Sequence, residues 1–314
     1  MIKRQHQKPR TALAGAALIA AFVVAPALAE KTYEEKVERT EALTQTGRLY
    51  LSNISGRIDV MTWGEAQVKI EVVKTSRAAT LEKAAENAAK VTVEVTKKDD
   101  LVRVLTQYPK RDSANVSVDY KVWVPDQAGV ELKSISGDVR VCPLGGKARV
   151  NCISGDIELL GAAAADIESV SGDLTIENIG GDAYLKTVSG DIAAKGISGS
   201  VDVGTVSGDV ELLGITGAQK VSAESVSGSI AYSGGVTSGG RYAITSHSGR
   251  VRMTIPAGAA FDLEASSFSG GIDNDFELQT AGEVSRREIR GTVGEGGATV
   301  VLRTFSGRIA LKRE

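Results

Sequence analysis

Five aspartates recur along the middle of the chain, each as the third residue of a Ser-Gly-Asp triplet. The triplets follow one another at steps of 17 or 18 residues. Equivalent positions in a stacked β-structure lie about 4.8 Å apart, so this spacing predicts a column of carboxylates. Oxygen ligands of this kind are preferred by hard divalent cations such as Ca²⁺. The candidate cation ligands are Asp138, Asp156, Asp173, Asp191 and Asp209.

The same column has a structural explanation that needs no cation. Carboxylates at this separation repel one another by roughly 1 kcal/mol in water. Hydrogen bonds to the backbone amides that a turn leaves unpaired would relieve the repulsion, and we favour this explanation. Neither role can extend along the whole array, because later copies of the triplet replace the acid with Ser229, Arg250, Gly271 or Arg308.

Other candidates for chemistry are few. His247 is the only histidine after residue 29, and it precedes a triplet where other copies have Val or Ile. We therefore expect a partly buried turn histidine rather than a catalytic base. The nucleophile motif Gly-x-Ser-x-Gly is absent. Cys142 and Cys152 could pair only if two strands slip in register, so we expect free thiols. No catalytic residue and no organic cofactor is assigned.

The elements that carry these residues form a repeat. Further triplets begin at Ser227, Ser248, Ser269 and Ser306, with an early one at Ser55, and a glycine turn falls midway between successive triplets. Each unit therefore reads as strand, turn, strand, turn. The pattern predicts an all-β fold, a β-solenoid of stacked two-strand coils of about 18 residues. In one coil we expect Val201, Val203, Val206, Val210 and Leu212 to face inward and Asp202, Gly204 and Glu211 to face outward.

A second column of small side chains lies two residues before each triplet serine. Small hydroxyl groups on an outer face suit a hydrogen-bonded ladder, which we favour over a glycan-binding face. Aromatic residues make up 4% of the chain, which leaves Tyr184, Tyr232 and Tyr242 as candidates for stacking on sugars. The column consists of Ser134, Cys152, Ser169, Thr187, Thr205, Ser225, Ser246, Ser267 and Thr304.

The chain divides into four segments. Residues 1–29 carry four cationic residues, an apolar stretch and the small-x-small end Ala27-Leu28-Ala29, which predicts a cleaved signal peptide. We expect a β-rich capping region with a helix near 77–90 in residues 30–130 and the regular solenoid in residues 131–235. Irregular coils and a cap should occupy residues 236–314, with a polar, Gly-rich insertion near 282–297.

Charge and hydropathy limit the compartment and the partners. Residues 131–235 contain seven basic and fourteen acidic residues, which argues against nucleic acid as a partner. No segment after residue 29 has the run of about eighteen apolar residues that a spanning helix needs. We therefore expect an exported protein, periplasmic or at the cell surface, with no transmembrane segment after signal cleavage.

The triplet turns, the strand Val118–Pro125 and the closing segment Thr304–Ile309 resemble a bacterial cell-envelope domain of unknown function known as "putative adhesin". This resemblance covers nearly all of the chain after residue 29 and implies a β-solenoid outside the cytoplasm. It supplies no catalytic residues. We expect a non-catalytic scaffold that binds an envelope protein or a cell-wall component. The alternatives are a carbohydrate-active enzyme built on a β-helix, and a structural or stress-related periplasmic module without a ligand.

Overall fold

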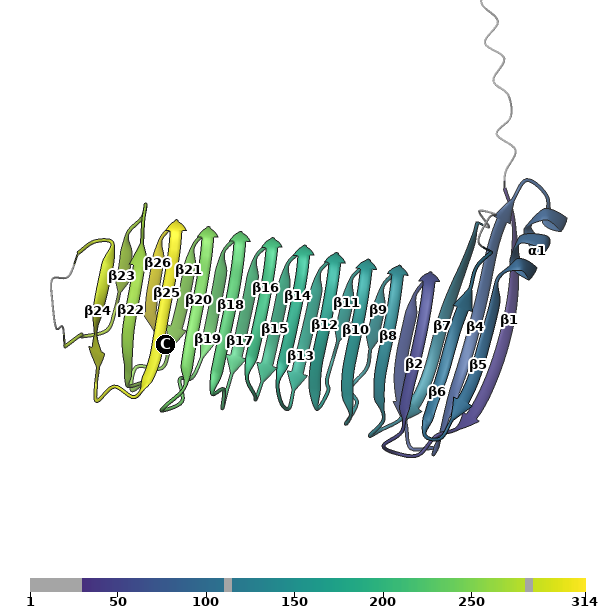
Figure 1. Cartoon of the computed structure of the whole chain (residues 1–314), viewed down its shortest axis with the longest axis horizontal. Coiled ribbons are helices and arrows are strands. Elements are labelled where there is room, and N and C mark those ends of the chain that lie inside the picture. Colours follow the sequence, from purple (N-terminus) through teal and green to yellow (C-terminus); the bar gives the residue numbers. More distant parts are fainter. Residues whose placement is uncertain (1–29, 110–114, 280–284) are drawn as a thin grey trace, which may run out of the picture.

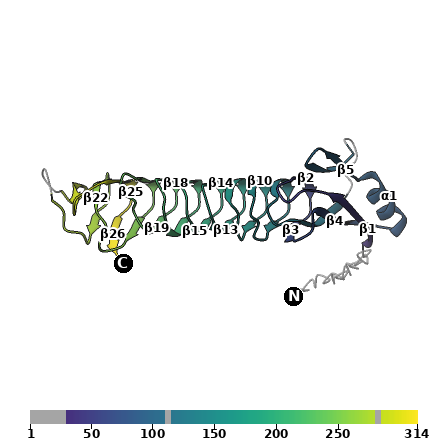
Figure 2. The same cartoon turned by 90° about the horizontal axis from the view of Figure 1, so that it is seen from below.

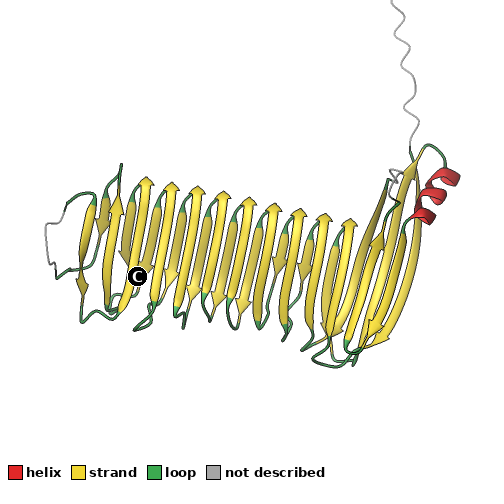
Figure 3. Ribbon diagram, viewed as in Figure 1, coloured by secondary structure: helices red, strands yellow, loops and turns green. Residues whose placement is uncertain are grey.

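The protein is an elongated stack of β-coils formed by two long sheets (Figures 1 and 3). The computed structural model describes residues 30–109, 115–279 and 285–314, so the predicted signal peptide lies outside the described residues. In the described part each sheet has thirteen strands, and the single helix lies at the N-terminal end. We call the sheet with the order β1-β4-β7-β3-β9-β11-β13-β15-β17-β19-β21-β26-β23 sheet I, and that with the order β24-β22-β25-β20-β18-β16-β14-β12-β10-β8-β2-β6-β5 sheet II.

The central coils place one strand in each sheet. Neighbouring strands are parallel and in register, so triplet serine pairs with triplet serine from coil to coil. In sheet II the strands are β8 (Gly129–Ser136), β10 (Lys147–Ser154), β12 (Ala164–Ser171), β14 (Ala183–Ser189), β16 (Val201–Ser207), β18 (Lys220–Ser227) and β20 (Arg241–Ser248). In sheet I they are β9 (Val139–Val141), β11 (Ile157–Leu159), β13 (Leu174–Ile179), β15 (Ile192–Ile197), β17 (Val210–Ile215), β19 (Ile230–Gly234) and β21 (Val251–Ile255). The predicted β-solenoid is confirmed.

The N-terminal region contains more than a cap. Strands β2 (Arg48–Ser55) and β3 (Ile58–Trp63) pair in parallel with β8 and β9, so the early triplet at Ser55 turns a true coil. Antiparallel pairing of β1 with β4 and of β5 with β6 closes this end. The other bounds are β1 (Lys31–Ala42), β4 (Gln67–Ala78), α1 (Leu81–Lys90), β5 (Thr92–Lys98), β6 (Leu101–Gln107) and β7 (Val116–Pro125).

Helix α1 begins four residues later than expected. Strand β4 continues to Ala78 because it pairs with β1 along its whole length. Thr80 then caps the helix, because its Oγ1 accepts a hydrogen bond from the backbone N–H of Lys83. The buried face of the helix carries Ala84 and Ala88. Figure 2 shows α1 and the antiparallel strands at one end of the row of coils.

The C-terminal coils do not stack in sequence order. The last coil, β25 (Ala298–Ser306) and β26 (Ile309–Arg313), lies between the coil of β20 and β21 and the coil of β22 (Phe261–Ser267) and β23 (Ile272–Asn274). Strand β24 (Glu288–Val293) pairs antiparallel with β22 at the edge of sheet II. Among the described residues, no helix is long and apolar enough to cross a membrane.

The core lies between the two sheets and follows strict alternation, which corrects one expectation. Val201 and Val203 are buried as predicted, whereas Val206 is 49% exposed and Thr205 is buried in its place. Gly204 lies on the outer face as predicted, but it is buried because the side chain of Lys186 lies across it. The side chain one residue before each triplet serine therefore points to solvent, and the side chain two residues before the serine points to the core.

Candidate functional site

The glycine of each triplet lies where successive coils approach most closely. In the five acidic coils this glycine has a φ between 127° and 149°, a region that side chains with a Cβ rarely adopt. A Cβ at Gly190 would lie 2.2 Å from the carbonyl oxygen of Gly172 in the preceding coil. Glycine is therefore required both by the turn and by the packing of one turn on the next.

The triplet aspartates connect the coils. Each carboxylate accepts a hydrogen bond from the backbone N–H of the equivalent residue in the next coil, at 2.7–3.2 Å. The series runs from Asp138, which accepts from Asp156, to Asp209, which accepts from Ser229. Asp119 of β7 likewise accepts from Arg57 at 2.8 Å. This bond is the physical reason for an acid at the position.

The predicted carboxylate column is a straight, exposed row rather than a cluster. Asp138, Asp156, Asp173, Asp191 and Asp209 lie on five successive coils, and all five are exposed. In the described part of the chain, no three or more His, Cys, Asp or Glu side chains gather closely enough to hold a metal ion. Cation binding by this row stays a prediction.

The small side chains two residues before each serine are buried, not on the outer face as expected. Ser246 is 1% exposed, and its Oγ donates to the carbonyl of Gly228 in the preceding turn at 2.9 Å. Ser225 and Thr304 make equivalent bonds. Cys152 occupies the same column, where burial raises the pKa of its thiol. The column satisfies turn carbonyls inside the solenoid, so it cannot form a glycan-binding face.

The side chains immediately before the triplet serines form an exposed line along the carboxyl ends of the sheet II strands. We call this line the apolar ridge. It crosses ten successive coils, and its nine apolar members are 36–68% exposed. An open groove of about 580 Å³ follows it over five coils, from β2 to β14. In spatial order the ridge consists of Ile54, Ile135, Ile153, Val170, Val188, Val206, Val226, His247, Phe305 and Phe268.

The ridge becomes aromatic at the C-terminal end. Phe305 stacks on Phe268 at 4.6 Å between ring centroids and on His247 at 4.9 Å, with nearly parallel rings in both pairs. This corrects the expectation that His247 is partly buried, because its side chain is exposed. Arg287 and Arg303 line the groove beside these rings.

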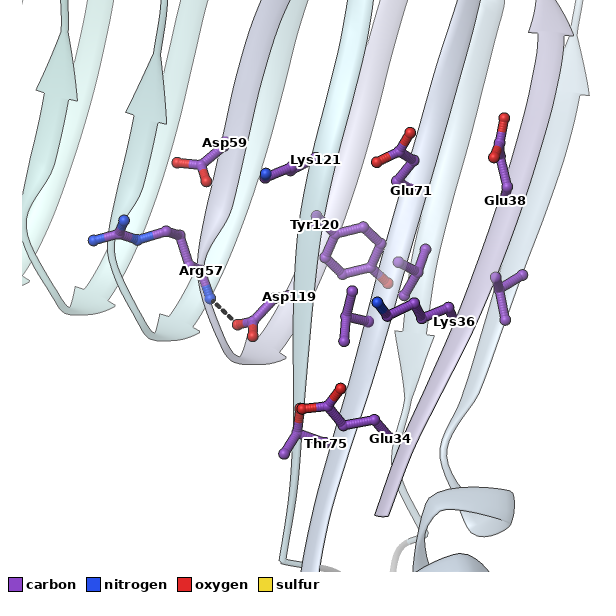
Figure 4. A pocket seen from close by; sticks show the side chains of 13 residues that line it. Glu34, Lys36, Glu38, Arg57, Asp59, Glu71, Thr75, Asp119, Tyr120 and Lys121 are labelled. Atoms are coloured by element: carbon purple, nitrogen blue, oxygen red, sulfur yellow. Dashed lines mark hydrogen bonds between the residues drawn. The ribbon is translucent and has the colours of Figure 1, made fainter. Parts of the chain in front are cut away.

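A second hollow, of about 970 Å³, lies on the outer face of sheet I near the N-terminal end (Figure 4). Side chains from β1, β3, β4 and β7 line it, and acidic and basic groups alternate within it. Lys121 lies between the carboxylates of Asp59 and Glu71, whereas the guanidinium of Arg57 pairs with Asp138 in the next coil. This mixture of signs selects neither an anion nor a cation.

The structure bears on two further predictions, one for the cysteines and one for the tyrosines. Cys142 and Cys152 are both free, as expected. Tyr232 and Tyr242 are buried in the core, which rules them out as sugar-stacking platforms, and only Tyr184 is accessible. Sequence reasoning missed the ridge itself. Its signal in the sequence is the series of seven Val or Ile residues that precede the triplet serines from Ile54 to Val226, which hydrophobicity alone assigns to the core.

The fold and these columns define a parallel β-solenoid with an exposed apolar line along sheet II. The chain matches the family model Toastrack DUF4097 over residues 48–312. It therefore belongs to this family, a domain of unknown function, which confirms the predicted resemblance at that level. No curated protein matches the chain.

Several solved structures are similar at low identity. A putative cell adhesion protein from Clostridium sporogenes is 12% identical, covering 89% of this chain and 100% of that chain, with a TM-score of 0.25. A putative adhesin from Parabacteroides distasonis is 11% identical, covering 89% and 97%, with a TM-score of 0.48. One from Bacteroides fragilis is 12% identical, covering 88% and 97%, with a TM-score of 0.37. The fold assignment rests on the family match and not on these likenesses.

Proposed function

We propose that this protein is a non-catalytic, exported scaffold of the cell envelope, which binds a protein or a cell-wall component along the ridge face of sheet II. The apolar ridge is the observation that carries the proposal. Single exposed apolar residues are ordinary on protein surfaces, whereas contiguous apolar strips mark interaction sites. Here one such side chain recurs on nine of the ten coils from Ile54 to Phe268, and His247 occupies the position on the tenth.

The polar groups support a scaffold rather than an enzyme. The triplet carboxylates are bonded to backbone amides, and the buried hydroxyls to turn carbonyls. Catalysis usually needs a nucleophile or a base held within hydrogen-bonding reach of a partner in a cleft. His247 stacks on Phe305 at the surface instead, and the grooves beside the ridge are open. The repeat therefore uses its polar atoms to hold coils together.

Site-specific photo-crosslinking in living cells would test the proposal. A photoreactive phenylalanine analogue at Val170 would report on the ridge face, and the same analogue at Ala193, exposed on the outer face of sheet I, provides the matched control. We expect crosslinked products from position 170 and few from position 193, recovered from the envelope fraction. Equal products from both positions, or products only in the cytosol, would contradict the proposal.

A further inference from the structure

We propose that the apolar ridge pairs with the ridge of a second copy of this chain, in antiparallel orientation about a two-fold axis. The inference rests on the proposed function, because it names the partner of the same face. Two features on this face carry it. One is the spacing of the ridge, and the other is the distribution of charge on either side of it.

The spacing favours a partner of the same architecture. Ridge side chains recur once per coil, at the separation of about 4.8 Å that neighbouring strands impose. If an extended strand lay along the ridge, its alternate side chains would recur at about 6.8 Å, and the turns of an α-helix would recur at about 5.4 Å. Neither period matches the spacing of the ridge side chains, so contact would be lost along the line. A second solenoid has the same period, so its apolar side chains keep contact along the whole line.

The residues at the third triplet position form a turn column beside the ridge. With the coils numbered in spatial order from that of β2, this column is acidic at coils two to six and basic at coils one, eight and nine. Asp173 and Asp191 lie on coils four and five, whereas Arg250 and Arg308 lie on coils eight and nine. An antiparallel arrangement with the two-fold axis between Val206 and Val226 places Asp173 opposite Arg308 and Asp191 opposite Arg250. By symmetry each pair forms twice. The chain therefore carries the complement of its own acidic turns.

Charges on the other side of the ridge select the same register. In this register Glu168, three residues before its triplet serine, lies opposite Arg303 of the partner copy. A shift by one coil in one direction would place Asp209 opposite its own symmetry mate. A shift in the other direction would place Glu224 opposite its own symmetry mate and Lys186 opposite Arg303, which are like charges in each case. Direct juxtaposition of like charges is destabilising.

The parallel orientation is less favourable. In the parallel orientation each coil faces the same coil of the partner copy, with the strand direction reversed. The third triplet residue of one copy then lies opposite the residue three positions before the triplet serine of the other. Asp138 and Asp191 would then face Lys133 and Lys186, but Asp173 would face Glu168 and Arg308 would face Arg303. The two attractive contacts would be offset by two repulsive ones, whereas the antiparallel register has attractive contacts without like-charge pairs.

The contact area fits a specific dimer. Eight coils overlap, which gives a strip about 34 Å long and about 17 Å wide, or roughly 1,150 Å² for the two surfaces together, above the roughly 1,000 Å² that a specific interface should exceed. Its centre is aliphatic, with Val206 and Val226 of both copies around the axis. The aromatic end, Phe305 and Phe268, meets Val170 and Ile153 of the second copy. An apolar centre with a charged rim is the usual anatomy of such interfaces.

Analytical ultracentrifugation of residues 30–314 over a range of concentrations tests the pairing. We expect a monomer–dimer equilibrium, which Val206→Glu weakens by at least about tenfold because it places two carboxylates beside the axis. Ala193→Glu, the same substituent on the outer face of sheet I, should leave the equilibrium unchanged. Arg250→Glu should also weaken it, and high salt should weaken the unsubstituted dimer. Circular dichroism would verify that each variant is folded.

Cysteine crosslinking tests the register. In a Cys142→Ser/Cys152→Ser background, a mixture of the Val206→Cys and Val226→Cys proteins should form a disulfide-linked dimer under mild oxidation, because these two positions lie opposite each other across the axis. The Val170→Cys protein should not, since its symmetry mate lies opposite Phe305, about five coils away.

A monomer at all concentrations, or a dimer that Val206→Glu does not weaken, would overturn the inference. The proposed function can fail separately. A monomer whose ridge still crosslinks to another envelope molecule would remove the dimer and leave the scaffold proposal intact. A ridge dimer whose crosslinks from position 170 contain only this chain would support the dimer and contradict the wider proposal.

Discussion

The five acidic coils and the later coils solve the same stacking problem with different turns. Both keep the glycine and the buried hydroxyl, and both keep parallel register, for example between β18, β20 and β25. They differ at the third triplet position. In the acidic coils a carboxylate accepts the N–H of the next turn, whereas Ser229, Arg250 and Arg308 provide no carboxylate there.

The difference separates what the fold requires from what it tolerates. Glycine is retained in every coil because the carbonyl of the neighbouring turn occupies the space of a Cβ. At Gly249 and Gly307, in the later coils, a Cβ would lie within 2.0 Å of that oxygen, as closely as at any acidic coil. The acid is replaceable, so its position is free to carry charge of either sign. This freedom allows one face to be acidic at one end and basic at the other.

The largest effect is expected from Gly190→Ala. The substitution forces a Cβ to within 2.2 Å of a backbone oxygen at a φ of 145°, and a clash with backbone cannot be relieved by a side-chain rotation. We expect a loss of about 3 kcal/mol or more in the free energy of unfolding, measured by urea denaturation. Gly249→Ala should cost a similar amount if glycine acts alike in both regions.

Gly235→Ala is the matched control, because nothing lies within 4 Å of a Cβ there. It should be close to neutral. A loss of under 1 kcal/mol at Gly190, or a loss at Gly235 as large, would show that coil packing does not explain the glycine. A large effect at Gly190 without one at Gly249 would instead mean that the two regions stack differently.

Much of the fold could be predicted from the sequence, since periodicity and glycine placement depend on local backbone geometry. The predicted two short strands per coil are present throughout the central coils. Thr205 and Val206 face the opposite way from the prediction because strand alternation, and not hydrophobicity, decides which side chain points to the core. The buried hydroxyl of Thr205 is stable because it donates a hydrogen bond to a turn carbonyl of another coil, and the sequence does not reveal that partner.

The stacking order of the last coils could not be predicted either. The triplets at Ser248, Ser269 and Ser306 are nearly equivalent, so nothing local determines which coil is next to which. In the structure β25 pairs with β20 on one side and β22 on the other, which are non-local contacts. The apolar ridge likewise emerges only once strands far apart in the sequence are aligned.

A smaller effect is expected from the acid itself. Asp173→Ala removes the acceptor for the N–H of Asp191, which lies 2.8 Å away, and should cost about 1 kcal/mol in the free energy of unfolding. Asp173→Asn keeps an acceptor oxygen and removes a repelling charge, so it should cost less than alanine. Ser229→Ala, at the same position beyond the acidic coils, should have no measurable effect.

Calcium distinguishes the two roles of the column. Amide bonding alone predicts that Ca²⁺ shifts the Tm no more than NaCl of equal ionic strength. A specific rise in Tm with Ca²⁺ that disappears in Asp173→Ala and Asp191→Ala would establish the cation site predicted from the spacing. Equal costs for asparagine and alanine at Asp173 would contradict the hydrogen-bond explanation.

The smallest effect is expected from ion pairs that connect coils on sheet II, which both regions contain. Partial burial opposes ionisation of Asp166, but hydrogen bonds from Arg149 and Lys147 outweigh it and lower the pKa of this carboxyl below its ordinary value of 3.8. A hydrogen bond from Arg303, 2.8 Å away, likewise lowers the pKa of Glu264.

A lowered pKa in the folded state contributes stability above the unfolded pKa, and this contribution is lost as the pH falls through the folded value. Asp166→Asn should therefore lower the Tm at pH 7 by about 1–2 °C, and the difference should shrink below about pH 4. Glu264→Gln should behave alike in the later coils. A difference in Tm that persists at low pH would show that the substitution removes packing and not charge. Different pH profiles for the two variants would mean that ion pairs do not stabilise the coils of the two regions in the same way.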